Sequence, residues 1–325
     1  MDILKPRIVY GPFEYPQFYE FYKKQQSVHW LIDEINMSSD VNDWKMNLSE
    51  KEKHLISSIL KGFTQSEIFI GNDYWSNVII KRFKKPEIQM MAATFASFEA
   101  IHADAYSTLE ETLGLQDYES FLKEPSAKAK IDRLMSRKTK TKEDLALSLA
   151  IFSAFNEGVN LFSSFAVLLS FSRRNLLKGV GQVIAFSVAD ESLHSKAGCE
   201  LFKILIAENP DIMTDEFKKQ IYDAARLTVE LEDSFLEQAF NQGDIEGLSL
   251  YDMKQFIRHR TNLKLEELGL KKNWKNLDKE ALERMMWFDA FSNPNLSHQD
   301  FFSGRSSQYA KGLQNWEEIW EEKND

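Results

Sequence analysis

The chain has 325 residues with only 13 Gly and 7 Pro but 24 Phe, a composition that favours long helices over a sheet rich in turns. Its net charge is −10 and its Lys and Arg residues are scattered among acids, so the chain offers no basic stripe for nucleic-acid phosphates and we expect no nucleic-acid partner. Cys199 is the only cysteine, which excludes an internal disulfide and a cysteine-based metal site and, with no signal-peptide pattern at the N-terminus, favours the cytoplasm.

Helical periodicity begins after a capping box formed by Ser49 and Glu52, and no proline interrupts it before Pro86. The pattern predicts one long helix over 55–83 and a second over 86–113, with the proline in its first turn. The polar, lysine-rich segment that follows favours short helices and loops. Periodicity then returns and predicts helices over 142–172, 175–208, 214–240, 250–268 and 279–291.

Segment 145–171 is long and apolar enough to raise the possibility of a transmembrane helix. Asn156, Glu157 and Asn160 fall together at its centre, where an ionisable group costs several kcal/mol in a bilayer. We therefore expect a helix buried in protein, and no membrane association.

The sequence changes character after Pro294. It becomes rich in Ser, Gly and Asn, and then acidic with isolated aromatic residues. This predicts a helical domain over 1–295 and a flexible C-terminal tail over 296–325. Trp316 and Trp320 in the acidic part are suited to docking onto a partner, and a surface helix turn or a disordered end is the simpler alternative.

Two helices carry a Glu-x-x-His pair. Glu99 and His102 lie in FEAIHADAY, and Glu191 and His194 lie in ADESLH. Residues three apart on a helix face the same way, so each pair can reach one metal ion. A single pair is weak evidence, because both residue types are common on solvated faces.

Two further long helices each place an acid in an apolar stretch, Glu67 and Glu157. A buried carboxylate needs a compensating charge. One arrangement compensates all six groups: a dinuclear metal site inside a four-helix bundle, with one Glu from each of two helices and one Glu-x-x-His from each of the others. The alternatives are that single acids lie on the surface and that the histidines are satisfied core residues.

With these motifs, the chain resembles the small, radical-generating subunit of class I ribonucleotide reductase over nearly its whole length. The segments KHLISSILKGFTQSE, FEAIHADAY and ADESLH carry the resemblance. It implies an all-α, ferritin-like four-helix bundle with additional helices, in a homodimer that acts with a separate large subunit in reducing ribonucleotides to deoxyribonucleotides. The implied metal ligands are Glu67, Glu99, His102, Glu157, Glu191 and His194.

The resemblance also assigns a route for an oxidising equivalent. Tyr106 matches the position of the stored tyrosyl radical, and Trp30 matches a tryptophan between the metal site and the surface. Asp190 matches the acid that links that tryptophan to a ligand histidine. Tyr309 matches the tail tyrosine that passes the radical to the large subunit.

The first implied ligand is Glu67, where most members of the family have Asp. Glutamate at this position resembles the branches that use manganese, either with iron or as two manganese ions. The implied cofactor is therefore a pair of ions, Mn/Mn, Mn/Fe or Fe/Fe, activated by dioxygen or a reduced oxygen species. In such branches the metal pair itself can hold the oxidising equivalent, which leaves the role of Tyr106 open.

Two rival functions share this pattern. One is another ferritin-like oxidase or monooxygenase, and the other is a non-catalytic iron-storage or structural protein. Tyr309, Trp30 and Asp190 favour the reductase subunit, because an oxygenase needs no electron path to its surface. No phosphate-binding loop is evident, since the glycine-rich KGVGQV at 178–183 lies inside a helical stretch, where helix packing explains it better.

Overall fold

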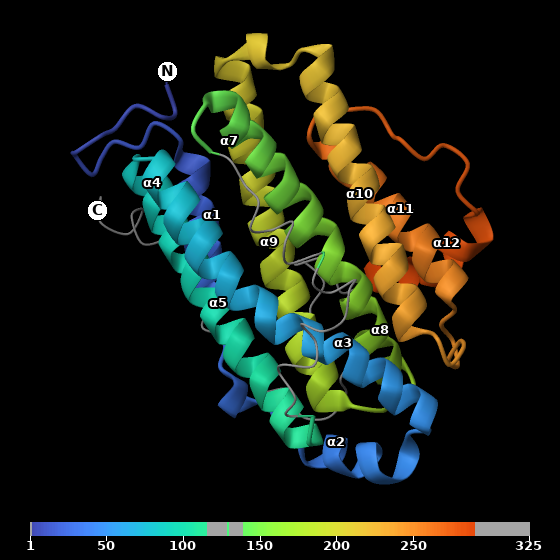
Figure 1. Ribbon diagram of the computed structural model, residues 1–325. Helices are drawn as coiled ribbons and strands as arrows, with labels where there is room; N and C mark the ends of the chain where they lie inside the picture. Colours follow the sequence, from blue (N-terminus) through green and yellow to red (C-terminus); the bar gives the residue numbers. More distant parts are fainter. Residues whose placement is uncertain (1, 116–128, 130–138, 290–325) are drawn as a thin grey trace, which may run out of the picture. The chain divides into compact units, whose positions relative to one another are not determined.

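Long helices run side by side through the part of the chain that the structure describes (Figure 1). The computed structural model describes residues 2–115, 129 and 139–289. Within them the only β-structure is an isolated bridge between Ile245 and Leu248. The compact unit spans Met1–Pro294. The predicted tail and most of the polar segment 116–140 lie outside the described residues.

Three kinds of helix occur along the described residues. The α-helices are α1 Pro16–Ser27, α2 Ser38–Asn42, α3 Glu50–Phe69, α4 Ile80–Arg82, α5 Pro86–Leu113, α7 Lys142–Leu149, α8 Leu161–Arg173, α9 Lys178–Glu208, α10 Asp215–Ala239, α11 Leu250–Glu267 and α12 Lys279–Met285. Three π-helices are η2 Asp43–Asn47, η3 Ile70–Ile79 and η5 Ala150–Asn160. Short 3-10 turns cover Ile32–Glu34, Pro210–Ile212 and Met286–Phe288.

Four long helical segments form the bundle that holds the site. They are α3 with η3, then α5, then α7 with η5 and α8, and finally α9. α3 packs against α5 and α8, and α9 packs against η5 and α8. α1 covers α5, while α10 and α11 pack against η5 from the other side. The expected all-α, ferritin-like bundle with additional helices is confirmed.

The two predicted helices 55–83 and 142–172 are continuous, but neither is α-helical throughout. Each contains a long π-helix, η3 in the first and η5 in the second. A π-helix closes its hydrogen bonds over five residues rather than four, which widens the turn and re-aims the side chains. Hydrophobic spacing carries no clear sign of this change, so the sequence did not predict it.

Helix α9 begins three residues later than predicted. Asn175 and Leu177 have φ values of 65° and 49°, in the left-handed region that ends helical backbone. Two acids from the segment α2–η2 cap the true start: Asp43 accepts from the Leu177 amide at 2.9 Å, and Asp40 accepts from the amides that follow. Because these capping acids are far from α9 in the sequence, the local pattern around the start of the helix does not reveal them.

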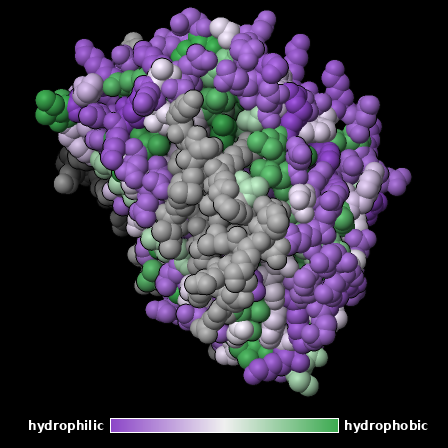
Figure 2. Space-filling model, viewed as in Figure 1, coloured by the Kyte–Doolittle hydropathy of each residue, from purple (hydrophilic) through white to green (hydrophobic). Residues whose placement is uncertain are grey.

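The apolar segment 145–171 lies in the helical stretch Lys142–Arg173, and 83% of the most apolar window of this stretch is buried within the protein. Charged and polar side chains predominate on the described surface in Figure 2. The helix therefore serves as the core of the bundle, in agreement with the expectation that its polar centre belongs inside protein.

A glycine sets the spacing between α9 and η5. A Cβ atom added at Gly198 would lie 1.7 Å from Ser153 Oγ and 2.3 Å from Ser153 Cβ. Ser153 itself is held in place, because its hydroxyl lies 2.7 Å from the Tyr74 hydroxyl. The two helices that carry Glu157 and Glu191 can therefore approach this closely only with glycine at position 198.

Gly198→Ala should lower the free energy of unfolding by about 1–3 kcal/mol, because the added methyl group overpacks this contact. Urea unfolding followed by circular dichroism measures the change. In a Ser153→Gly background the same substitution should no longer destabilise, since its collision partner is gone. A Gly198→Ala variant as stable as the parent, which helix propensity alone would favour, would contradict this explanation.

Candidate metal centre

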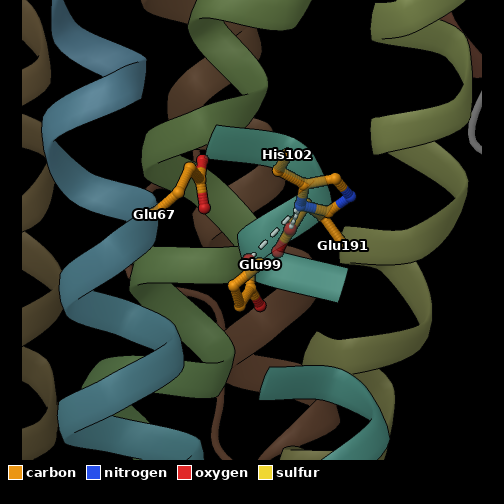
Figure 3. Close-up of side chains that lie close together, drawn as sticks. All are labelled: Glu67, Glu99, His102 and Glu191. Carbon is orange, nitrogen blue, oxygen red and sulfur yellow. Dashed lines mark hydrogen bonds and ion pairs between the residues drawn. The ribbon is translucent and has the colours of Figure 1, made fainter. Parts of the chain in front are cut away.

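Six buried acid and imidazole groups come together at the centre of the bundle, and four of them are drawn in Figure 3. Each of the six residues has no exposed surface. They come from four segments: Glu67 from α3, Glu99 and His102 from α5, Glu157 from η5, and Glu191 and His194 from α9. All six metal ligands implied by the sequence are thus brought to one place.

The six residues form two overlapping groups of four. Glu67, Glu99, His102 and Glu191 form the first, and Glu99, Glu157, Glu191 and His194 form the second. Within each group one oxygen or nitrogen atom per residue lies within 4.8 Å of the others. Glu99 and Glu191 belong to both groups. Two ligand groups that share two carboxylates would suit a dinuclear metal site.

Many atoms of the cluster approach one another without forming hydrogen bonds. His194 Nδ1 lies 2.9 Å from Glu99 Oε1, yet neither atom has a hydrogen-bond partner in the described part of the chain. Both oxygens of Glu67 and both of Glu191 also lack partners there. Buried polar atoms are rarely left unsatisfied. Lone pairs directed at a common point fit metal ions, and carboxylate with imidazole suits iron or manganese.

The crowding of these buried groups shifts their pKa values. Burial, with the neighbouring carboxylates of Glu99 and Glu191, raises the pKa of Glu67 well above its usual range. Burial and the charge of Glu191 also raise the pKa of Glu157 well above its usual range. Burial also acts to raise the pKa of Glu99, but His194 and His102 lower it overall. Raised pKa values mean that these acids favour a bound proton or a nearby cation, and cations binding there would displace protons.

Burial alone would lower the pKa of both histidines. For His102, the contact with Asp190 and the nearby carboxylates of Glu191 and Glu99 raise the pKa well above its usual value. For His194, the charges of Glu99 and Glu191 raise it. The direction shows that the acids surrounding each imidazole outweigh the cost of desolvating its charged form.

Asp190 links the cluster to the outer layer of the bundle. Its Oδ2 atom accepts a hydrogen bond from Trp30 Nε1 at 2.9 Å and lies 3.1 Å from His102 Nε2. Its Oδ1 atom accepts from Gln25 Nε2 at 2.7 Å. With Nε2 directed at Asp190, His102 presents Nδ1 to the cluster, and a carboxylate that orients a ligand imidazole in this way is usual at metal sites.

Tyr106 lies one turn beyond His102 on α5 and is fully buried. Its ring centroid is 6.1 Å from that of His102 and 4.7 Å from that of Phe63, which in turn packs against Phe165. The hydroxyl has no hydrogen-bond partner among the described residues. Burial raises the pKa of Tyr106 well above its usual value, so the phenol stays protonated at neutral pH.

Sequence reasoning missed three side chains of this region. Trp75 in η3 donates its indole N–H to Glu157 Oε1 at 2.8 Å, Gln25 holds Asp190, and Phe63 covers Tyr106. By local pattern Trp75 and Phe63 are ordinary core residues and Gln25 belongs to a polar stretch, and only the packing of distant segments gives each its role. Tyr309 lies outside the described residues.

Comparisons with known proteins agree with this geometry. The family described as "Ribonucleotide reductase, small chain" matches residues 7–280. A probable ribonucleoside-diphosphate reductase small subunit of Invertebrate iridescent virus 3 is 35% identical, over 96% of this chain and 86% of the relative. The corresponding protein of Invertebrate iridescent virus 6 is 33% identical, over 98% and 99% of the two chains.

The fold is also shared with solved structures. The dimanganese(II) form of NrdF from Streptococcus sanguinis superimposes with a TM-score of 0.73 at 20% identity, over 86% of this chain and 99% of that chain. The likeness in fold, together with the family match over most of the sequence, leads to one conclusion: the chain belongs to the ribonucleotide reductase small chain family.

Proposed function

We propose that Glu67, Glu99, His102, Glu157, Glu191 and His194 hold two metal ions, and that the oxidising equivalent produced there serves ribonucleotide reduction in a separate large subunit. The observation that carries the proposal is the pair of buried four-residue groups that share Glu99 and Glu191. Four carboxylates balance two divalent ions and tolerate their higher oxidation states.

The ions are proposed to be manganese, iron or one of each. Glu67 supports manganese, because its longer side chain resembles that of the manganese-using branches of the family. The dimanganese(II) neighbour in fold supports it as well. When bound, the ions supply a strong one-electron oxidant after reaction with dioxygen or a reduced oxygen species.

Tyr106 is proposed to store that oxidising equivalent. Its phenol is neutral, because burial raises its pKa, and its ring lies beside the ring of His102. Phe63 stacks on one side at 4.7 Å and is itself covered by Phe165. This aromatic wall keeps water away from the phenol, so that an oxidised ring would be protected from reduction by solvent species.

His102, Asp190 and Trp30 are proposed to carry the equivalent outward. The indole N–H of Trp30 donates to Asp190 Oδ2 over 2.9 Å. When the indole loses an electron its proton becomes acidic, and this oxygen is placed to receive it. When the electron returns to the indole, the proton returns from Asp190 to the indole nitrogen. No unbalanced charge then stays inside the bundle. Tyr309 in the tail is the proposed last carrier of this chain.

The proposed assembly is a homodimer in the cytoplasm, bound to the large subunit through the tail 296–325. The family match favours this function over that of a ferritin-like oxidase or monooxygenase. The hydrogen-bonded set His102, Asp190 and Trp30 favours the reductase subunit, because such a connection leads away from the cluster rather than toward a substrate cavity.

Tyr309→Phe should abolish deoxyribonucleotide production by the mixed subunits, reducing the rate by at least about a hundredfold, since phenylalanine cannot lose a proton with its electron. Binding to the large subunit, measured by surface plasmon resonance, should stay unchanged. Tyr251→Phe removes an exposed hydroxyl on α11 and serves as the control, with full activity expected. Full activity of the Tyr309 variant would show that the relay is assigned wrongly.

Tyr106→Phe should eliminate the tyrosyl signal in electron spin resonance of the activated protein, together with its activity. Tyr74→Phe, which alters another fully buried tyrosine, should keep the signal. Retained activity in the Tyr106 variant, with a coupled metal signal in place of the tyrosyl one, would move the stored equivalent to the metals and contradict the role given to Tyr106.

A further inference from the structure

Helix α11 supplies no residue to the metal cluster, yet it contacts the backbone directly beside Glu157. Arg260 on α11 donates its Nε–H to the carbonyl oxygen of Gly158 at 3.1 Å. Arg260 and Lys264 are four residues apart, so both side chains lie on the same face of α11. This face meets η5 at the residue that follows the ligand.

The guanidinium group of Arg260 is fixed by aromatic rings. Its Cζ atom lies 3.5 Å from the ring centroid of Phe162, and the rings of Phe256 and Phe288 are 5.8 and 5.9 Å away. Phe162 lies one helical turn after Gly158. Arg260 therefore contacts two successive turns of the same helical segment, one through a hydrogen bond and one through a cation–π contact.

The contact lies where the helical register changes. The π-helix η5 ends at Asn160, and α8 continues from Leu161. Changing from hydrogen bonds over five residues to bonds over four leaves a backbone carbonyl without a partner in the helix, so a donor from outside stabilises the backbone near the change. The register also sets the direction of Glu157, because one residue of slip turns a helical side chain by about 100°.

Gly158 packs closely against side chains from two neighbouring helices. A Cβ atom there would lie 2.5 Å from Lys264 Cε and 2.8 Å from Ser195 Oγ. Ser195 directly follows His194 on α9. Three helical segments therefore meet at Gly158, immediately beside two residues of the cluster.

We propose that Arg260 is a positioning residue: by holding the Gly158 carbonyl and the Phe162 ring, it fixes the register of η5 and directs the Glu157 carboxylate at the second ion position. The inference rests on the proposed function, in which Glu157 is a metal ligand. It assigns a role at the metal centre to a helix outside the four ligand-bearing segments.

The test compares Arg260→Gln with Arg258→Gln. Arg258 is also half-buried on α11, but it pairs with Asp233 on α10. The first readout uses metal-free protein: the indole N–H resonance of Trp75, which donates to Glu157 Oε1, is followed by NMR with ¹⁵N-labelled tryptophan. The chemical shift of this resonance should change in Arg260→Gln and stay the same in Arg258→Gln.

The second readout is calorimetric titration with Mn²⁺. Arg260→Gln should weaken binding of one of the two ions by about tenfold, the low end of the range for residues that orient ligands, and Arg258→Gln should bind both normally. Arg260→Lys, which keeps the charge but not the planar donor, should give the same changes at smaller amplitude. It also provides the test if the glutamine variant does not fold.

Glu157→Ala tests the ligand role of Glu157 separately from the positioning role of Arg260. This variant should lose one ion entirely. If it does, while Arg260 variants match Arg258→Gln in both readouts, the positioning role is overturned and the metal site stands. If Glu157→Ala still binds two ions with normal affinity, the ligand assignment itself fails, and the role of Arg260 fails with it.

Discussion

The burial of four carboxylates beside two imidazoles is the constraint on which the rest of this structure depends. Moving a single unpaired carboxylate out of water costs several kcal/mol, and here Glu67, Glu99, Glu157 and Glu191 are all without exposed surface. Burial and the neighbouring carboxylates raise the pKa values of Glu67 and Glu157 well above their usual range, which is the electrostatic sign of this cost. Two divalent ions would remove this cost and turn the repulsion between the acids into attraction to a shared charge.

This constraint explains several features of the surrounding helices. Glycine allows close approach at Gly198, where α9 meets η5, and at Gly71, where an added Cβ would lie 3.0 Å from Glu99 Cβ. The π-helices η3 and η5 occur in the same two segments that supply Glu67 and Glu157. Widened turns are a known way to aim side chains into a site, at some cost in backbone hydrogen bonding. At Gly158 a side chain from another helix, Arg260, supplies a hydrogen bond to the backbone carbonyl.

Much of this arrangement was readable from the sequence. Three-residue spacing placed Glu99 with His102 and Glu191 with His194, and the helical periodicity located the long helices within a few residues. What could not be read depends on contacts between distant segments: the capping of α9 by α2 and η2, the π-helical registers, and the partners Trp75, Gln25 and Arg260. Spacing along one helix determines which residues share a face, but not which neighbour that face meets.

The most direct test is a crystal structure of the metal-loaded protein with anomalous scattering recorded at the manganese and iron absorption edges. The account predicts two peaks per chain, each within coordination distance of one histidine, with Glu99 and Glu191 adjacent to both. The two edges would also identify the metals. Peaks held by other side chains, or no peak among these six residues in protein that contains two ions per chain, would contradict it.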